Sequence, residues 1–190
     1  MNFKLLRQLI QSPIETGTTS ASSEKISQLI ADSANLPEKK SIVELGPGTG
    51  VFTKQIIQRI SSGTLFFCLE INEQFVKDTR SNCPNAIVYH ASALDIKKYL
   101  LKHNLKHCDC IVSGLPWGLF GLEIQKQLLN EVYDSLESGG KFLAIAYITG
   151  LMFKPGIRFK KLLNQKFQKV EKTRIIWGNI LPAFIYICTK

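Results

Sequence analysis

The residues whose types and spacing best suit chemistry lie in one short string, Val-Glu-Leu-Gly-Pro-Gly-Thr-Gly at positions 43–50. It joins a short apolar run, typical of a buried strand, to a segment from Val51 onward with helical periodicity. Glycines at such a turn let the backbone approach a ligand closely, and the first turn of the helix offers unpaired N–H groups to an anion. Glu70 lies 24 residues beyond Gly46, at the end of the next apolar run, where a carboxylate can accept hydrogen bonds from both hydroxyls of a ribose. Turn and carboxylate together predict a nucleoside-binding site at the carboxyl edge of a sheet.

Two departures from common nucleotide motifs narrow the choice of cofactor. The dinucleotide fingerprint requires a small residue where this chain has Val51, and a phosphate-cradling loop requires Gly-Lys-Ser/Thr where it has Gly-Val-Phe at 50–52. The string at 43–50 resembles motif I of the class I S-adenosylmethionine-dependent methyltransferases, in which the anion at the helix end is the methionine carboxylate. The resemblance implies that S-adenosylmethionine is the cofactor, with close approach at Gly46, Gly48 and Gly50 and the ribose on Glu70.

The segment after the third apolar run is expected to meet the adenine. The family often carries Asp or Glu at the position of Ser92, followed by a small residue such as Ala93. The Ser92 hydroxyl can accept one hydrogen bond, but the same residue equally suits a simple turn, and both interpretations stay open. Four further residues complete the expected cofactor-binding set: Gly17, Glu44, Ile71 and Ser113.

The acceptor is expected beside the fourth predicted strand, which ends in Ser-Gly-Leu-Pro-Trp at 113–117. Methyltransferases that act on amino groups often carry Asn-Leu-Pro-aromatic at this place, and here Gly114 replaces the Asn that accepts a hydrogen bond from a planar nucleobase amine. Methylation of a base therefore loses support. Trp117 can be read as a substrate wall or as a core aromatic. The residues expected to shape the acceptor pocket are Leu115, Pro116, Trp117 and Tyr147, and none of them is an obvious general base.

A second resemblance covers almost the whole chain. The sequence is similar to the bacterial phospholipid N-methyltransferases that resemble rRNA adenine dimethylases and that methylate phosphatidylethanolamine. The segments that carry the likeness are Pro13, Gly17, Ser22-Ser23, the string 43–50, the loop 113–116, Tyr147 and the string Asn-Ile-Leu-Pro-Ala at 179–183, which departs from the family pattern by one residue of spacing and one proline. The resemblance implies direct displacement, in which a neutral amine attacks the methyl carbon of the sulfonium and S-adenosylhomocysteine leaves.

Three functions stay open on the sequence. The first is methylation of a phosphatidylethanolamine-type lipid. The second is methylation of RNA adenine or of another small-molecule amine. The third is a non-catalytic binding module on a methyltransferase fold, against which the intact glycine turn and Glu70 argue.

The elements that must position these residues alternate along the chain. Short apolar runs separated by helical segments indicate a parallel sheet covered on both faces, joined by right-handed crossovers. The last two strands are joined by a connection too short for a crossover, so they must be antiparallel. The expected fold is an α/β three-layer Rossmann-like sandwich with a seven-stranded, mostly parallel sheet, in one domain over 1–190 with an N-terminal helical cap at 1–36 and a core at 37–190. Strands are expected at 41–46, 64–71, 86–91, 108–113, 140–147, 169–177 and 183–189, and helices at 2–11, about 24–35, 50–61, 72–81, 94–103, 119–137 and 157–167.

Composition and charge bound the partners. The chain has 190 residues, of which 45% are hydrophobic and 21% charged, which is a globular balance. Its net charge of +9 is concentrated at 154–174, where eight basic residues and one acidic residue give +7. Such a segment attracts phosphate, either of an anionic membrane surface or of RNA, although a solvated helix face has the same composition.

Several classes are disfavoured by pattern. The apolar run at 142–153 is interrupted and falls short of the roughly 18 residues of a membrane span, and the first residues do not form a secretory signal. The five cysteines suggest reduced thiols, and His103, His107, Cys108 and Cys110 lack the second ligand pair of a zinc site, so no metal is expected. We expect a cytoplasmic protein, and the sequence leaves open both its peripheral association with the inner membrane face and its oligomeric state.

Overall fold

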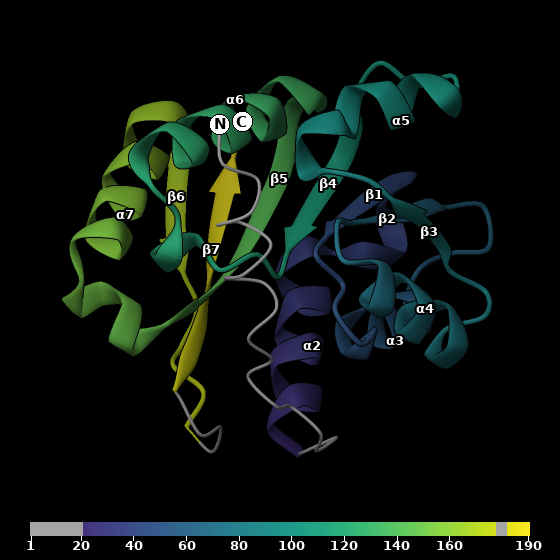
Figure 1. Ribbon diagram of the computed structural model, residues 1–190, viewed down its shortest axis with the longest axis horizontal. Helices are drawn as coiled ribbons and strands as arrows, with labels where there is room; N and C mark the ends of the chain where they lie inside the picture. The colour runs from purple at the N-terminus through teal and green to yellow at the C-terminus, as the bar shows by residue number, and fades with distance from the viewer. Residues whose placement is uncertain (1–20, 178–181) are drawn as a thin grey trace.

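A seven-stranded sheet forms the centre of the computed structural model, which describes residues 21–177 and 182–190. The strand order is β3-β2-β1-β4-β5-β7-β6. Only β7 runs against its neighbours, because both of its pairings are antiparallel while all the other pairings are parallel (Figure 1). The strands are β1 Ser41–Leu45, β2 Leu65–Glu70, β3 Ile87–His90, β4 Cys108–Ser113, β5 Leu136–Tyr147, β6 Lys169–Lys172 and β7 Ala183–Thr189. The expected α/β fold, with one antiparallel strand at the end of the chain, is confirmed.

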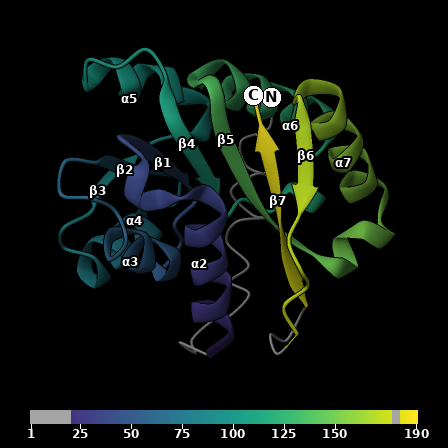
Figure 2. The same cartoon turned by 180° about the vertical axis from the view of Figure 1, so that it is seen from behind.

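Helices cover both faces of this sheet, as Figures 1 and 2 show from opposite sides. One core cluster joins the sheet to α5 Ile96–Lys102, α6 Leu122–Ser135 and α7 Lys154–Lys166. The other joins it to α2 Ala21–Ala34, α3 Val51–Ile57 and α4 Glu73–Asn82. Because side chains of a strand alternate between these two clusters, β1 is buried along its whole length. This burial on both faces explains why the strands are continuous apolar runs in the sequence.

Most expected elements are confirmed, and the differences have local causes. The fifth strand was expected to begin after a Gly139-Gly140 turn, but β5 begins at Leu136. The pairing between β4 and β5 is irregular here, because Cys108 pairs with Leu136 whereas Cys110 pairs with Lys141. Gly139, with φ +76°, lies in the extra residues of β5 between these two pairs. Correspondingly, α6 is shorter than the expected 119–137, since a separate 3₁₀ turn, η3 Trp117–Leu119, precedes it.

The basic helix and the strand after it also differ from expectation. α7 begins at Lys154 instead of 157, because Pro155 suits a first helical turn, whose N–H groups have no helical partner. β6 ends at Lys172 instead of 177, and beyond it Ile176 makes one isolated antiparallel bridge to Ala183.

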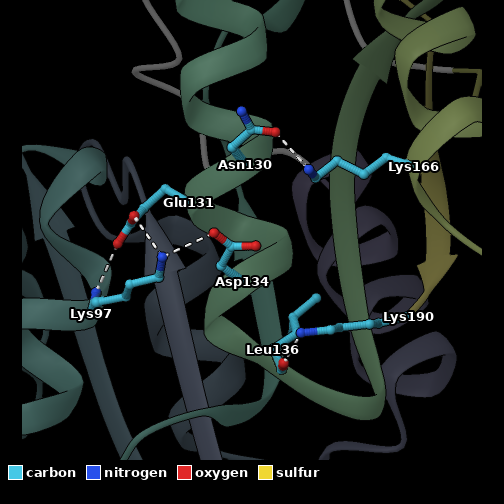
Figure 3. A network of polar contacts seen from close by, with 7 residues as sticks. All are labelled: Lys97, Asn130, Glu131, Asp134, Leu136, Lys166 and Lys190. Carbon is cyan, nitrogen blue, oxygen red and sulfur yellow. Dashed lines mark hydrogen bonds and ion pairs between the residues drawn. The ribbon is translucent and has the colours of Figure 1, made fainter.

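The helix α6 is tied to its neighbours by polar contacts from three elements (Figure 3). Lys97 at the start of α5 lies 3.0 Å from Asp134 and 3.7 Å from Glu131. Lys166 at the end of α7 donates a hydrogen bond to Asn130, and Lys190 donates one to the Leu136 carbonyl. These contacts are partly exposed and each stabilises little, but together they fix the helix layer over β4 and β5.

The N-terminal part of the chain is described from α2 onward. Ile26 and Ile30 of α2 are buried in the core cluster that contains Ile42, Leu143 and Ile185, so this helix covers a face of the sheet. The expected helix at 2–11 and the motif residues Pro13 and Gly17 lie outside the described residues, as does the stretch 179–181 of the late motif. No helix of the described part is both long and apolar enough to cross a membrane.

Candidate active site

The glycine turn lies where β1 ends and α3 begins, and all three glycines have positive φ: +69° at Gly46, +60° at Gly48 and +86° at Gly50. A Cβ at Gly46 would come within 2.8 Å of Leu115 Cδ2, and one at Gly50 within 3.1 Å of Cys83 Sγ. A Cβ at Gly48 would meet nothing within 4 Å. A side chain at Gly46 or Gly50 would therefore combine a positive φ with a close neighbour, the flexible end of Leu115 or the Cys83 thiol, whereas Gly48 faces open space at the sheet edge, as a ligand cradle demands.

Glu70 ends β2 next to this turn. Its Oε2 accepts a hydrogen bond from the Gly48 backbone N–H at 3.3 Å, and its Oε1 accepts one from the Asn72 N–H at 2.8 Å. The side chain is only 3% exposed, and burial raises the pKa of the carboxyl above its usual value. The fold thus brings together the glycine turn and Glu70, as their spacing in the sequence indicated. The two carboxylate oxygens of Glu70 retain lone pairs that can accept hydrogen bonds from hydroxyl groups.

Glu44, expected among the cofactor contacts, is turned beneath the glycine turn. Its Oε2 accepts hydrogen bonds from the Thr53 hydroxyl at 2.7 Å and from the Cys68 thiol at 3.3 Å. Burial raises the pKa of this carboxyl to about 7. Glu44 therefore links β1 to α3, and it supports the turn from below. The sequence analysis missed Thr53, although a threonine in the first helical turn after the glycines was visible.

The expected adenine segment follows β3. The Ser92 hydroxyl accepts a hydrogen bond from the Leu94 N–H, while the Ser92 N–H donates to Asp95, so the pair forms a capping box. These bonds favour the turn interpretation of Ser92. The Ala91 N–H donates to the Glu70 carbonyl, which places this segment beside Glu70, and both Ile71 and Ala93 are half-buried there.

The loop after β4 is folded tightly against the glycine turn. Ser113 is fully buried, and its hydroxyl accepts hydrogen bonds from the Leu115 N–H and from the Trp117 indole N–H at 2.9 Å. The Gly114 N–H donates to the Leu45 carbonyl, and a Cβ at Gly114 would lie 2.8 Å from the Gly46 carbonyl oxygen. This backbone therefore leaves no room for an asparagine at 114 unless the loop moves.

Trp117 packs inward from this loop. Its side chain is 2% exposed and stacks on Phe159 of α7 with ring centroids 4.5 Å apart. Much of the ring therefore belongs to the core. It still borders the apolar cavity formed by this loop, the end of β5 and α7, so its position is compatible with both interpretations, a core aromatic and a substrate wall.

A buried glutamine holds the same loop to α7. Gln125 of α6 is fully buried, and its amide donates to the carbonyls of Trp117 and Pro155 at 2.7 and 3.0 Å. Its Oε1 accepts a hydrogen bond from Arg158, which also donates to the Phe120 carbonyl. Nothing in the local sequence distinguished Gln125 from other helix glutamines, because its partners lie up to 33 residues away along the chain.

An apolar cavity of about 210 Å³ opens where this loop, the end of β5 and α7 meet. Three of the four expected acceptor residues line it, whereas Leu115 lies against Gly46 instead. The Tyr186 hydroxyl, from β7, is buried and has no hydrogen-bond partner among the described residues, and burial raises its pKa to about 12. The lining residues are Pro116, Trp117, Gly118, Leu119, Ile145, Ala146, Tyr147, Thr149, Gly150, Leu151, Phe153, Gly156, Phe159 and Tyr186.

No cluster of histidine, cysteine, aspartate or glutamate in the described part of the chain is arranged to hold a metal ion. All five cysteines are free and buried. His103, which the sequence placed near a cysteine pair, stacks on Phe67 and contacts the Tyr89 hydroxyl.

Comparisons with known proteins agree with this geometry. A family model described as ribosomal RNA adenine dimethylase matches residues 17–152. An ornithine lipid N-methyltransferase of Singulisphaera acidiphila is 29% identical over 81% of this chain and 79% of that enzyme. The ribosomal RNA small subunit methyltransferase A of Bacillus licheniformis is 30% identical, but over 46% of this chain and 31% of that enzyme. Among solved structures, the O-methyltransferase TomG of Streptomyces achromogenes, in complex with S-adenosylmethionine, superposes with a TM-score of 0.69 at 17% identity, over 91% of this chain and 82% of that one.

Proposed function

The chain belongs to the ribosomal RNA adenine dimethylase family and is an S-adenosylmethionine-dependent methyltransferase, and we propose that the amine it methylates is carried by a membrane lipid. The observation that carries the proposal is the apolar cavity bordered by Pro116, Trp117 and Tyr147, which is lined in part by the same loop whose Leu115 packs against Gly46 of the glycine turn. The likeness to an ornithine lipid N-methyltransferase over most of both chains supports it.

The cofactor-binding residues follow from the edge geometry. S-adenosylmethionine supplies an electrophilic methyl group when bound. In the proposed arrangement Gly48 leaves space for the methionine part, and Glu70 accepts hydrogen bonds from the ribose hydroxyls. Ile71 and the segment at Ser92-Ala93 flank the adenine, while Glu44 and Ser113 hold the turn and the loop in place. Gly17, which lies outside the described residues, is also proposed to contact the cofactor.

The cavity can favour a reactive amine without a dedicated base. Among the described residues that line it, the only titratable side chains are tyrosines. An apolar wall disfavours the ammonium form, so it lowers the pKa of a bound amine and leaves the lone pair available. Tyr186 stays protonated near neutral pH, since its pKa is raised to about 12, so its hydroxyl can accept from an amine N–H or donate to a headgroup oxygen. Aromatic faces also tolerate the positive charge of a methylated product.

The loop geometry disfavours a nucleobase acceptor. A base amine held for methylation needs a planar set of hydrogen-bond acceptors, which related enzymes take from an asparagine side chain at the position of Gly114. Here a side chain at 114 would collide with the Gly46 carbonyl. A flexible lipid amine needs only an apolar wall beside the methyl donor.

RNA remains the second candidate acceptor, because the matching family model is named for rRNA adenine methylation. The basic residues of 154–174 also suit a phosphate backbone. The aligned rRNA methyltransferase of Bacillus licheniformis, however, shares only 31% of its length with this chain, so its whole activity cannot be carried over.

Transfer of a labelled methyl group to chemically matched lipids tests the proposal. Purified protein is incubated with methyl-labelled S-adenosylmethionine and mixed micelles of phosphatidylethanolamine, its monomethyl form or ornithine lipid. N-acetylated phosphatidylethanolamine, which lacks a free amine, is the control. Label in the organic phase with the free amines and none with the blocked amine is the expected result. Absence of label in every free-amine lipid, with active cofactor turnover on RNA, would contradict the proposal.

A further inference from the structure

Exposed apolar side chains lie on the segments that line the cavity and directly beside the lining residues. Leu119 is 57% exposed, Met152 77%, Phe153 63% and Ile157 56%. They come from η3, from the 3₁₀ turn η4 Ile148–Met152 and from the first turn of α7, and α7 packs against both turns. Leu119 and Phe153 also line the cavity. Single exposed apolar residues are ordinary, but four on segments that pack together beside one cavity indicate a contact surface. We call these four residues the apolar rim.

Lysines continue this surface along α7. Phe153, Ile157 and the pair Lys160-Lys161 follow one another at helical spacing, and all four side chains are exposed. Lys154 is exposed beside them, and α7 contains no aspartate or glutamate. Arg158 does not belong to this surface, because it is bonded to Gln125 and to the Phe120 carbonyl. The helix thus presents apolar residues at the cavity and cations one turn further on.

We propose that the apolar rim together with Lys154, Lys160 and Lys161 is the face by which the protein docks on an anionic lipid bilayer, with the mouth of the cavity turned toward the headgroups. The rim side chains enter the boundary between headgroups and acyl chains, and the lysines contact lipid phosphates while their methylene stems cover apolar surface. This inference rests on the proposed function in one respect only, that a docked cavity would receive its amine from the membrane.

The side chains on this face fit a bilayer better than the other occupants. Single-stranded RNA binds through cations combined with successive aromatic stacking platforms, whereas only Phe153 among the four rim residues offers a ring for a base. A second copy of the chain on the same face would offer no acidic partner for Lys154, Lys160 and Lys161, since a two-fold interface repeats the same patch on both sides and α7 contains no aspartate or glutamate. An anionic bilayer offers both an apolar phase and negative charge.

Vesicle binding by the full chain tests the inference without use of the methyl-transfer reaction. Sedimentation with vesicles of phosphatidylcholine, with and without phosphatidylglycerol, measures the partition of the wild type and three variants. Met152→Ser with Ile157→Ser removes rim residues that do not line the cavity. Lys160→Glu with Lys161→Glu reverses the charge. Leu101→Ser, which removes a 62% exposed leucine on α5, is the matched control.

The rim variant is expected to lose about tenfold or more of its partition onto both vesicle types, because its buried apolar area is lost. The lysine variant is expected to lose binding only on anionic vesicles, by about 25-fold or more, because each Lys near the membrane surface contributes roughly fivefold and the two new carboxylates are repelled. Leu101→Ser should bind as the wild type does. Equal binding by all variants, or a loss of RNA binding in the lysine variant with vesicle binding intact, would overturn the inference. So would a rim variant that changes oligomeric state and still binds vesicles.

A second measurement separates this inference from the proposed function. If the lipid acceptor is right, the rim variant should retain methyl transfer to lipid dispersed in detergent micelles and lose it on vesicles. If no lipid is methylated at all, the vesicle partition still decides whether the face docks on membranes.

Discussion

At the residue scale, Gly48 is the glycine of the turn whose missing side chain leaves open space for the proposed cofactor. Gly48→Ala adds one methyl group that meets no protein atom within 4 Å, at a backbone with φ +60°. Gly139→Ala is a matched control, since Gly139 has φ +76°, equally open surroundings and a position in the irregular first part of β5, away from the glycine turn. Both variants should lose about 1–2 kcal/mol of stability from backbone strain. Only Gly48→Ala should also lose affinity for S-adenosylmethionine, by about tenfold or more in calorimetry if its methyl fills ligand space. Equal affinity in the two variants would remove Gly48 from the site.

Glu44 makes the stability of the protein depend on pH. Its pKa is raised by burial from 4.5 to about 7, so between these values the folded protein holds a proton that the unfolded chain releases. Stability therefore falls as pH rises through this window and levels off above it, by at most about 3 kcal/mol. Glu44→Gln keeps an acceptor for Thr53 and removes the titration. The urea unfolding free energy of the variant minus that of wild type should rise from about pH 5 to about pH 8. A difference that is the same at both pH values would contradict this account of the carboxyl.

The buried Tyr186 hydroxyl is expected to contribute nothing to stability, or to lower it slightly, and to take part in acceptor binding. Its buried hydroxyl has no partner among the described residues, so Tyr186→Phe should leave stability unchanged or raise it by about 1 kcal/mol. If the hydroxyl contacts the acceptor, the same change raises the KM for the lipid while affinity for S-adenosylmethionine stays constant. Ser135→Ala is the control, because Ser135 also has a buried hydroxyl without a partner but does not line the cavity. The same KM in both variants and the wild type would assign Tyr186 a packing role only.

At the element scale, Gln125 couples α6, α7 and the acceptor loop. Gln125→Leu should cost about 2–3 kcal/mol of stability, because it removes three hydrogen bonds of a fully buried side chain, those to the Trp117 and Pro155 carbonyls and that from Arg158. It should also reduce methyl transfer more than it reduces affinity for S-adenosylmethionine, since it loosens the loop at 113–120 and not the glycine turn. Gln165→Leu, at an exposed position of α7, should change neither. A loss of cofactor affinity as large as the loss of turnover would argue against separate control of the acceptor side.

The elements were predicted well where one local pattern decides them. β4 begins and ends where its apolar run does, and the glycine turn and Glu70 meet as their spacing indicated. β5 was misjudged because a Gly-Gly pair is a turn signal in the sequence, whereas here it forms an irregularity inside a strand that its neighbour keeps paired. Gln125 and the Tyr186 hydroxyl were missed because their environments arise only when distant segments pack together.

At the scale of the whole molecule, several of the basic residues at 154–174 are engaged by partners within the fold, so only part of this charge is free on the surface of α7. Arg158 is used inside the fold, Lys166 is bonded to Asn130, and Lys169 pairs with Glu171 at 2.9 Å. The remaining lysines on the cavity side of α7 lie beside exposed apolar residues, a combination that no count of charge along the sequence distinguishes from a solvated helix face.

The central claim is that a methyltransferase of this family uses its apolar cavity for a lipid amine. A competition in one tube tests it most directly: the protein receives methyl-labelled S-adenosylmethionine together with vesicles that contain phosphatidylethanolamine and with unmodified small-subunit rRNA. Chloroform extraction separates lipid from RNA, and nuclease digestion identifies any methylated base. If the acceptor is a lipid amine, the label should appear in the lipid phase on the headgroup amine, and the RNA should stay unlabelled. Label in N6-methylated adenine, with the lipid unlabelled, would contradict it.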